Sequence, residues 1–291
     1  MKNSEFKSFH PFVNLIYFVF AVGFSCILLH PAFLLVSLIT GLCYSYILNG
    51  KSFLRRLLNI FISMVFMGLI NPLFNHQGAT ILTYFPSGNP LTKESLMYGA
   101  FTGVMIASVL LWFGCFNCIF TTDKIIYLFG KLSPSLSLIF SMTLRFVPNF
   151  SNRLKHILKT QKTLGKALNS GSILERAKNG LSVISILTTW ALESSVTTAD
   201  SMKARGFGTA KRTFYSRFTF TKKDLFALIY ILTLGSYVLA GIILKKASFE
   251  FFPVLKWESA SFFSTSLILA YIMLLSFPVG LEILEVRKWK S

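Results

Sequence analysis

Long apolar runs alternate with short polar segments along this chain, and a single long polar segment interrupts the pattern. Each apolar run approaches the roughly 20 residues that a helix needs to cross the hydrocarbon core of a bilayer. The runs cover approximately residues 12–29, 31–48, 54–72, 96–119, 224–244 and 260–281. This pattern predicts an all-α integral membrane protein with about six transmembrane helices.

Only His30-Pro31 separates the first two runs. A break is expected there, because proline does not continue a helix comfortably. The two runs are either two full spans or a tight re-entrant hairpin. Merging them into one span would make the number of spans odd and would place the two termini on opposite sides of the membrane. Six spans are therefore preferred.

The charged residues support this topology. The chain is 53% hydrophobic and only 14% charged, yet 29 Lys and Arg residues stand against 11 Asp and Glu, a formal net charge of +18. With the N-terminus inside, all basic residues fall on the inner side except Lys93, Lys245, Lys246 and Lys256. This asymmetry follows the positive-inside rule. We expect a multi-pass protein of the cell (plasma) membrane with both termini cytoplasmic. Its first span should be retained, because it lacks a convincing cleavage site.

Residues 120–223 form the long polar segment, with 17 basic and four acidic residues. It is too long for a loop and must contain helices of its own. Its first helix is expected to begin at Ser133-Pro134 and to kink at Pro148. The sequence thus predicts three parts: transmembrane helices 1–4 in residues 1–119, a cytoplasmic helical domain in residues 120–223, and transmembrane helices 5–6 in residues 224–291.

The second helix of this domain carries signals at both ends. Ser172-Ile173-Leu174-Glu175 fits a capping box, in which the hydroxyl and the carboxylate satisfy free amide donors. Gly206 stands where a helix would stop in the left-handed conformation. The helix between them has about 33 residues and a length of roughly 50 Å.

Small residues recur on one face of this helix at three- and four-residue steps. Such residues let another helix approach closely. Ala191, Ser195 and Ala199 are therefore the predicted helix-crossing contacts.

The stretch Ala199-Asp200-Ser201-Met202-Lys203-Ala204-Arg205-Gly206-Phe207 resembles the Ala-Met-x-Ala-Arg-Gly-Phe signature of energy-coupling factor transporter T components. These are the transmembrane coupling subunits of a class of vitamin and metal-ion importers. Three further segments look like family landmarks in the family order: Asn71-Pro72-Leu73-Phe74, Thr122-Asp123-Lys124 and Leu144-Arg145-Phe146-Val147-Pro148. The resemblance covers essentially the whole chain.

The resemblance implies a coupling subunit of an ATP-driven importer of vitamins or other micronutrients. Its partners would be two ATP-binding cassette ATPase subunits, a small substrate-binding membrane subunit and the lipid bilayer, with ATP hydrolysis on the ATPases rather than on this chain. Two long crossing helices would make the domain 120–223 a coupling-helix domain, with each helix end docking into one ATPase.

The two docking ends differ in sequence. The second motif is intact at Ala204, Arg205 and Gly206. The first is expected at Thr163, Leu164 and Gly165, where Leu164 replaces the arginine. The spacing alone also allows a simpler role for Lys203 and Arg205. Cations near the C-terminus of a helix interact favourably with the negative end of its dipole, without any partner.

The residues offer little chemistry of their own. No phosphate-binding G-x-x-x-x-G-K-[ST] loop occurs, and the predicted spans hold almost no acidic residue away from their ends, which disfavours an ion-coupled transporter. The cysteines all lie in apolar runs, where a free cysteine behaves as a small apolar residue. No metal site and no cofactor is therefore expected. Nucleic acid is an unsupported partner, because no binding motif occurs.

A membrane-embedded enzyme acting on lipid-linked substrates is the alternative function. It would need His, Asp or Glu residues clustered at the inner membrane face. Asp123, His156, Glu193 and Asp200 are dispersed and nominate no catalytic site.

Overall fold

The computed structural model describes residues 5–50, 53–84, 90–132, 134–166, 171–209, 218–244, 246 and 262–290. The chain forms two units, one made of Met1–Thr122 with Phe218–Ser291 and one made of Asp123–Arg217. They are called here the transmembrane unit and the long-helix unit, and each is described by itself.

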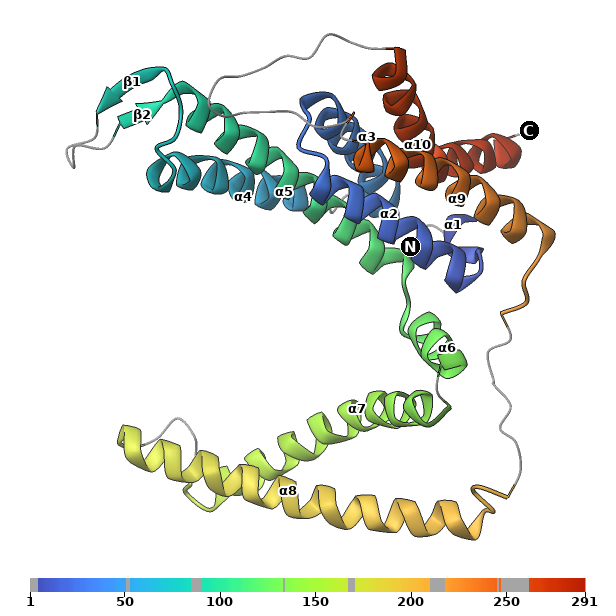
Figure 1. Ribbon diagram of the computed structural model, residues 1–291. Coiled ribbons are helices and arrows are strands. Elements are labelled where there is room, and N and C mark those ends of the chain that lie inside the picture. Colours follow the sequence, from blue (N-terminus) through green and yellow to red (C-terminus); the bar gives the residue numbers. More distant parts are fainter. Residues whose placement is uncertain are drawn as a thin grey trace. The chain divides into compact units, whose positions relative to one another are not determined.

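The transmembrane unit consists almost entirely of helices (Figure 1). Its elements are α1 (Glu5–Ser8), α2 (Pro11–Ile27), α3 (Pro31–Asn49), α4 (Phe53–Phe74), β1 (Ile81–Tyr84), β2 (Pro90–Thr92), α5 (Lys93–Ile119), α9 (Lys222–Ile243) and α10 (Phe262–Lys290). The two short strands pair antiparallel, with Ile81 opposite Thr92 and Tyr84 opposite Pro90.

Among the described residues, five helices are long and apolar enough to cross a membrane. These segments are Pro31–Leu48, Leu57–Phe74, Lys93–Ile119, Lys222–Ile243 and Phe262–Leu284. The prediction of an all-α integral membrane protein is confirmed. Helix α2 is also apolar but has 17 residues, so the sixth span stays a prediction.

The break between the first two apolar runs lies where the sequence predicts it. Helix α2 ends at Ile27, and α3 begins with Pro31 in its first turn. His30 caps α3, because its Nδ1 accepts a hydrogen bond from the Ala32 amide at 3.2 Å. Proline suits a first helical turn, where its missing amide hydrogen leaves no bond unmade.

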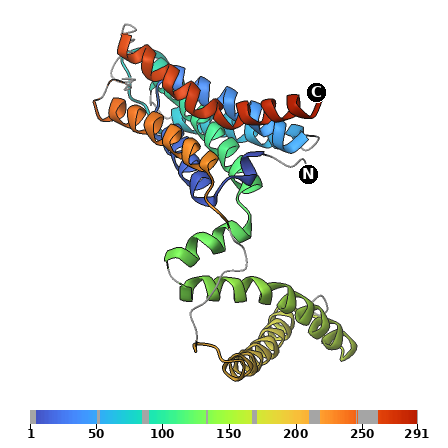
Figure 2. The same cartoon turned by 90° about the vertical axis from the view of Figure 1, so that its right-hand side faces the viewer.

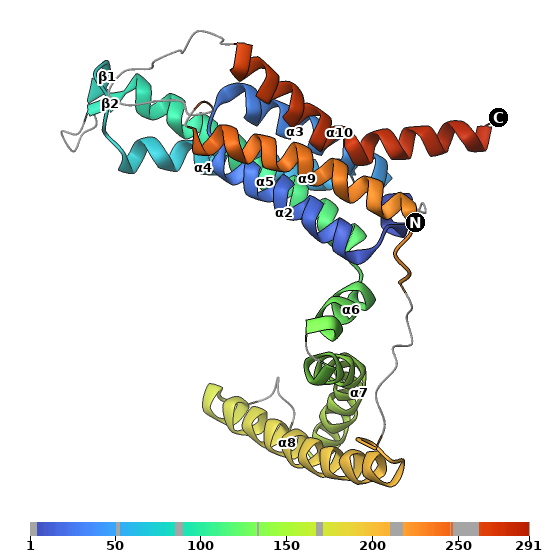
Figure 3. The same cartoon turned by 45° about the vertical axis from the view of Figure 1, so that its right-hand side comes forward.

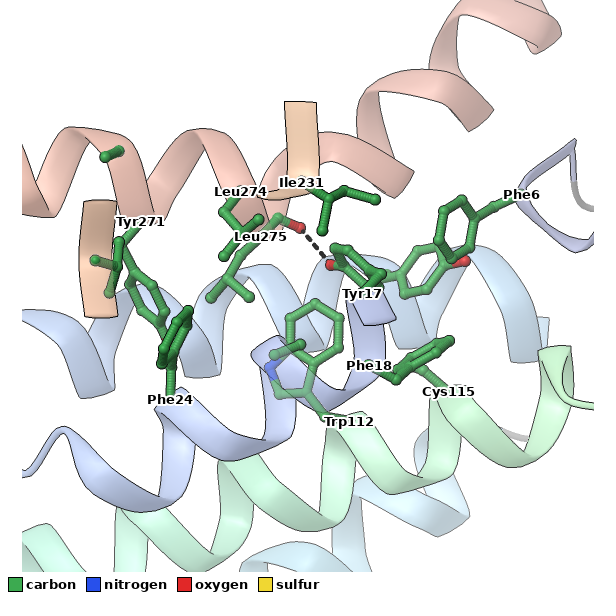
Figure 4. Packing of buried hydrophobic residues seen from close by; sticks show 14 of the residues in the cluster. Phe6, Tyr17, Phe18, Phe24, Trp112, Cys115, Ile231, Tyr271, Leu274 and Leu275 are labelled. Atoms are coloured by element: carbon green, nitrogen blue, oxygen red, sulfur yellow. Dashed lines mark hydrogen bonds between the residues drawn. The ribbon is translucent and has the colours of Figure 1, made fainter. Parts of the chain in front are cut away.

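Aromatic side chains fill the core of the transmembrane unit (Figure 4). The Tyr17 hydroxyl donates to the Leu275 carbonyl at 3.1 Å and so joins α2 to α10. The Trp112 indole donates to the Ser37 hydroxyl at 3.1 Å and joins α5 to α3. Buried Tyr and Trp need such partners, because an unmade hydrogen bond in an apolar interior is costly.

Helices α4 and α5 pack through glycines. A Cβ atom added at Gly99 would lie 2.5 Å from the Gly68 carbonyl oxygen, and one added at Gly103 would lie 2.6 Å from the Met64 carbonyl oxygen. Both distances are too short for a side chain. The absence of side chains at Gly99 and Gly103 therefore allows the two backbones to approach, as in other membrane helix pairs.

The start of α9 is tied to the start of α2. The Asp224 carboxylate caps α9 by accepting from the Thr221 amide at 2.9 Å. Its other oxygen accepts from the His10 amide at 2.8 Å, and His10 is the N-cap of α2. Figure 3 shows α9 lying between α2 and α10.

The long-helix unit contains α6 (Thr122–Leu132, whose first residue belongs to the transmembrane unit), α7 (Pro134–Thr163) and α8 (Ile173–Ala204). Helix α7 continues through Pro148 for 30 residues, and its ribbon bends along its length (Figure 2). Helix α8 has 32 residues and a length of roughly 48 Å.

Candidate functional site

The candidate site consists of the C-terminal ends of α7 and α8 and the crossing between these helices. Helix α8 begins as the sequence predicts. The Ser172 hydroxyl accepts from the Glu175 amide at 3.3 Å, and the Glu175 carboxylate accepts from the Ser172 amide at 3.0 Å. The capping box is thus confirmed, and it fixes where the 32-residue helix starts.

The end of α8 is a Schellman motif. The Phe207 amide donates to the Met202 carbonyl at 3.0 Å, and the Gly206 amide donates to the Lys203 carbonyl at 3.0 Å. Gly206 has a φ of +78°, as the sequence predicts for this position. The motif satisfies carbonyl groups that a helix end leaves free. It leaves Arg205 as the C-cap residue, with an exposed side chain.

The end of α7 has the same geometry. The Lys166 amide donates to the Gln161 carbonyl at 3.0 Å, and the Gly165 amide donates to the Lys162 carbonyl at 3.2 Å. Gly165 has a φ of +73°. Leu164 therefore stands at the C-cap, the position that Arg205 holds on α8, and 65% of its surface is exposed.

The two predicted docking motifs are thus equivalent in backbone and different in chemistry. Thr163-Leu164-Gly165 presents a branched apolar side chain, whereas Ala204-Arg205-Gly206 presents a guanidinium with a planar set of donors. A guanidinium can form two parallel hydrogen bonds with a carboxylate, and leucine can only be covered by apolar surface.

The contact between α7 and α8 is made by larger residues than the sequence suggests. The rings of Phe150 and Trp190 lie 5.5 Å apart, edge to face. The Arg153 guanidinium lies 5.5 Å from the centre of the Trp190 ring, in a cation–π arrangement. Ile157 on α7 and Val183 on α8 are both buried.

Sequence reasoning missed this aromatic contact. Phe150, Arg153 and Ile157 are spaced by three and four residues along α7, so they share one face of the helix. That spacing is readable from the sequence, but the partner Trp190 is not. The choice of partner depends on where the two helices meet, and no local pattern specifies that point.

The predicted small-residue contacts begin at Ala191, directly after Trp190, and continue along α8 to Ala199. Ala191 is half-buried, and Ser195 and Ala199 are exposed in this chain. Their role as contact points stays a prediction. Helix α8 also exposes large apolar side chains, including Leu181, Leu192 and Val196, each more than 60% exposed. Exposed apolar residues in such number are typical of a surface that another protein covers.

The three family landmarks occupy structurally distinct positions. Asn71-Pro72-Leu73-Phe74 forms the end of α4, and Thr122-Asp123-Lys124 begins α6. Leu144-Arg145-Phe146-Val147-Pro148 lies within α7, with Arg145 exposed. Across the described ranges, no group of three or more His, Cys, Asp or Glu side chains is arranged to hold a metal ion.

Comparison with known proteins identifies the family. The family CbiQ, described as cobalt transport protein, matches residues 6–216, which is more than two thirds of the chain. The energy-coupling factor transporter transmembrane protein EcfT of Lactobacillus helveticus is 31% identical over 105 residues, covering 36% of this chain and 38% of the relative. EcfT of Streptococcus thermophilus is 28% identical over 113 residues, covering 38% and 43%.

A longer match extends over both units. EcfT of Ruminiclostridium cellulolyticum is 27% identical over 207 residues, covering 66% of this chain and 76% of the relative. The chain spans about two fifths of the length of the first two relatives, at 38% and 43%. The resemblance to T components that the motifs indicate is confirmed, and this chain belongs to the CbiQ family, described as cobalt transport protein.

Proposed function

We propose that this chain is the transmembrane coupling subunit of an ATP-driven importer of vitamins or other micronutrients. In this proposal it joins two ATP-binding cassette ATPase subunits to a small membrane subunit that binds the substrate. Residues 120–223 are the cytoplasmic coupling domain between transmembrane parts 1–119 and 224–291. The substrate is selected by the other membrane subunit, and ATP is hydrolysed on the ATPases.

The observation that carries the proposal is the matched pair of helix ends. Helices α7 and α8 each end in the same Schellman motif and present one exposed C-cap side chain, Leu164 or Arg205. A pair of equivalent ends suits a pair of related partner subunits, because each end can enter a similar groove. We assign one ATPase to each end.

Arg205 is the stronger docking contact in this proposal. Its guanidinium is exposed, and its backbone is fixed by the cap. If the ATPase groove supplies a carboxylate, the pair forms in a site from which water is excluded. Leaving one partner of such a pair unmatched costs about 2–5 kcal/mol in binding.

The exposed apolar side chains of α8 suit a contact with the other proposed partner, the small substrate-binding membrane subunit. Leu181, Leu192 and Val196 are exposed in this chain, although α8 belongs to a unit rich in basic residues. We propose that the small substrate-binding subunit covers them. Movement of α7 and α8 with the ATPases would then reach that subunit directly through this contact.

Purification of the intact complex tests the proposal. The chain is tagged, extracted from its native membranes in mild detergent, and its co-purifying subunits are identified by mass spectrometry. Two ATPase subunits and a small apolar membrane protein are expected in stoichiometric amounts. An unrelated membrane protein with the same tag is the control. Recovery of the chain without ATPases would overturn the proposal and favour an autonomous membrane enzyme.

A further inference from the structure

A groove of about 790 Å³ lies on the transmembrane unit between α1, α9 and α10. Its lining is mostly apolar and includes two charged residues, Glu5 and Lys223. The lining residues include Lys223, Phe226, Ala227, Thr233, Phe277 and Leu284.

The groove runs along α9 from its first turn toward its middle. Lys223 is at the start of the helix and Thr233 lies ten residues further on, a distance of roughly 15 Å along the axis. The hydrocarbon core of a bilayer is about 30 Å thick, so the groove has the depth of one leaflet. On α10, which supplies the opposite wall, Phe277 and Leu284 are seven residues apart and share one face.

The walls and floor suit a hydrocarbon chain. Phe226 is 73% exposed and Leu284 is 58% exposed, so both offer apolar surface that this chain does not cover. Ala227, with 5% of its surface exposed, lies at the floor. Its small side chain leaves the space that a longer one would fill.

The groove is preformed by contacts on each side of it. The Tyr230 hydroxyl on α9 donates to the Met273 carbonyl on α10 at 3.2 Å. The rings of Phe6 and Phe277 lie 6.2 Å apart and join α1 to α10. Binding to a preformed site needs no free energy for rearrangement of the protein, and small-molecule pockets are usually preformed.

Lys223 supplies a positive charge where the groove begins, at the first turn of α9. Its side chain is exposed and makes no ion pair with any described residue. A lysine ammonium at the membrane surface attracts the phosphate groups of lipids. Glu5 also lines the groove, so its charge is mixed, and the phosphate is the headgroup feature that Lys223 would select.

We propose that this groove binds one phospholipid of the adjacent leaflet, with an acyl chain between α9 and α10 and the phosphate against Lys223. The proposal depends on the membrane location given above and adds a lipid to the partners of this chain. Bound in this way, the lipid covers the apolar walls and holds α1 against the α9–α10 pair.

Lipid binding to the purified full chain tests this site. The chain in detergent is titrated with dioleoylphosphatidylglycerol, and bound lipid is counted by native mass spectrometry. Lys223→Gln is expected to weaken binding about fivefold, the effect of removing one basic residue at a lipid surface. Lys222→Gln is the matched control, because it removes the same charge from the same helical turn outside the groove lining.

Ala227→Leu tests the acyl chain rather than the headgroup. It fills the floor and should abolish the tightly bound lipid, with thermal unfolding measured to check that the variant folds. Equal weakening by Lys222→Gln and Lys223→Gln, or unchanged lipid binding in a folded Ala227→Leu variant, would overturn the proposal. The measurement uses the chain without ATPases, so its failure would be distinct from a failure of the coupling function.

Discussion

Replacement of Arg205 by alanine separates a docking role from a purely local one. In the isolated chain the Arg205 side chain is exposed, and the cap of α8 is held by backbone hydrogen bonds. Its loss should therefore cost the fold no more than the interaction with the helix dipole, about 0.3–1 kcal/mol. The thermal stability of the purified chain should change little.

The cost in the complex is expected to be larger. If Arg205 pairs with a buried carboxylate, its removal costs about 2–5 kcal/mol in binding. At 1.4 kcal/mol for each factor of ten, this corresponds to a roughly 30- to 4,000-fold loss of affinity for one ATPase. Leu164→Ala removes three carbon atoms, worth about 2.4 kcal/mol if the partner covers them completely.

The assay is a pull-down of both ATPases from membranes that contain each variant at equal expression. Arg205→Ala should lower ATPase recovery and transport much more than Leu164→Ala. Lys203→Gln is the matched control, because it removes one positive charge from the same helix end. A local dipole role predicts equal, small effects of Lys203→Gln and Arg205→Ala.

Two results would refute the reasoning. Intact recruitment by the Arg205→Ala variant would mean that the guanidinium only complements its own helix. Equal losses in Arg205→Ala and Leu164→Ala would mean that the two ends contribute through shape rather than through charge. The first result would place coupling on other residues of α7 and α8.

Four further predictions follow from the charge pattern and the packing. Leu164→Arg places a guanidinium on the matching cap of α7 and should strengthen ATPase recovery in the pull-down; unchanged recovery would show that the two grooves differ. A cysteine placed at Lys166 should react with membrane-impermeant reagents only after cells are opened, because basic segments face the cytoplasm; labelling in intact cells would contradict that topology. Ala199→Trp should weaken assembly of the complex by about 1–3 kcal/mol of overpacking while leaving the isolated chain folded, because Ala199 is exposed in this chain; normal transport would show that this face is not an interface. Gly99→Ala should lower the thermal stability of the chain, because its Cβ would lie 2.5 Å from a carbonyl oxygen of α4. Gly23→Ala is the control that should leave thermal stability unchanged, because its Cβ would have nothing within 4 Å.

The sequence by itself indicated the long helices and several of their ends, but it missed α1 and α6. The first helix of residues 120–223 is α6 (Thr122–Leu132) rather than the helix expected to begin at Ser133-Pro134, which is the second, α7. Apolar runs of membrane-spanning length predict transmembrane helices whatever their neighbours are. The capping box of α8 and the left-handed Gly206 were equally readable, because every atom of a cap comes from within about six residues. The sequence also located the α7 motif at residues 163–165, although it did not indicate that its cap would match that of α8.

The tertiary structure decided which residues meet. Tyr17 and Leu275 are 258 positions apart, and Trp112 and Ser37 are 75 apart, so no local period links them. The crossing of α7 and α8 shows the same limit: small residues indicated one contact face, and the structure places Phe150 against Trp190.

The groove beside α9 has the same origin. Helices α9 and α10 each read as an ordinary apolar span, and the groove forms only where they lie beside α1. Hydrophobic attraction is non-directional, so it selects burial without selecting partners. Shape, glycine positions and a few long-range hydrogen bonds then set the arrangement, and they act only once the helices are side by side.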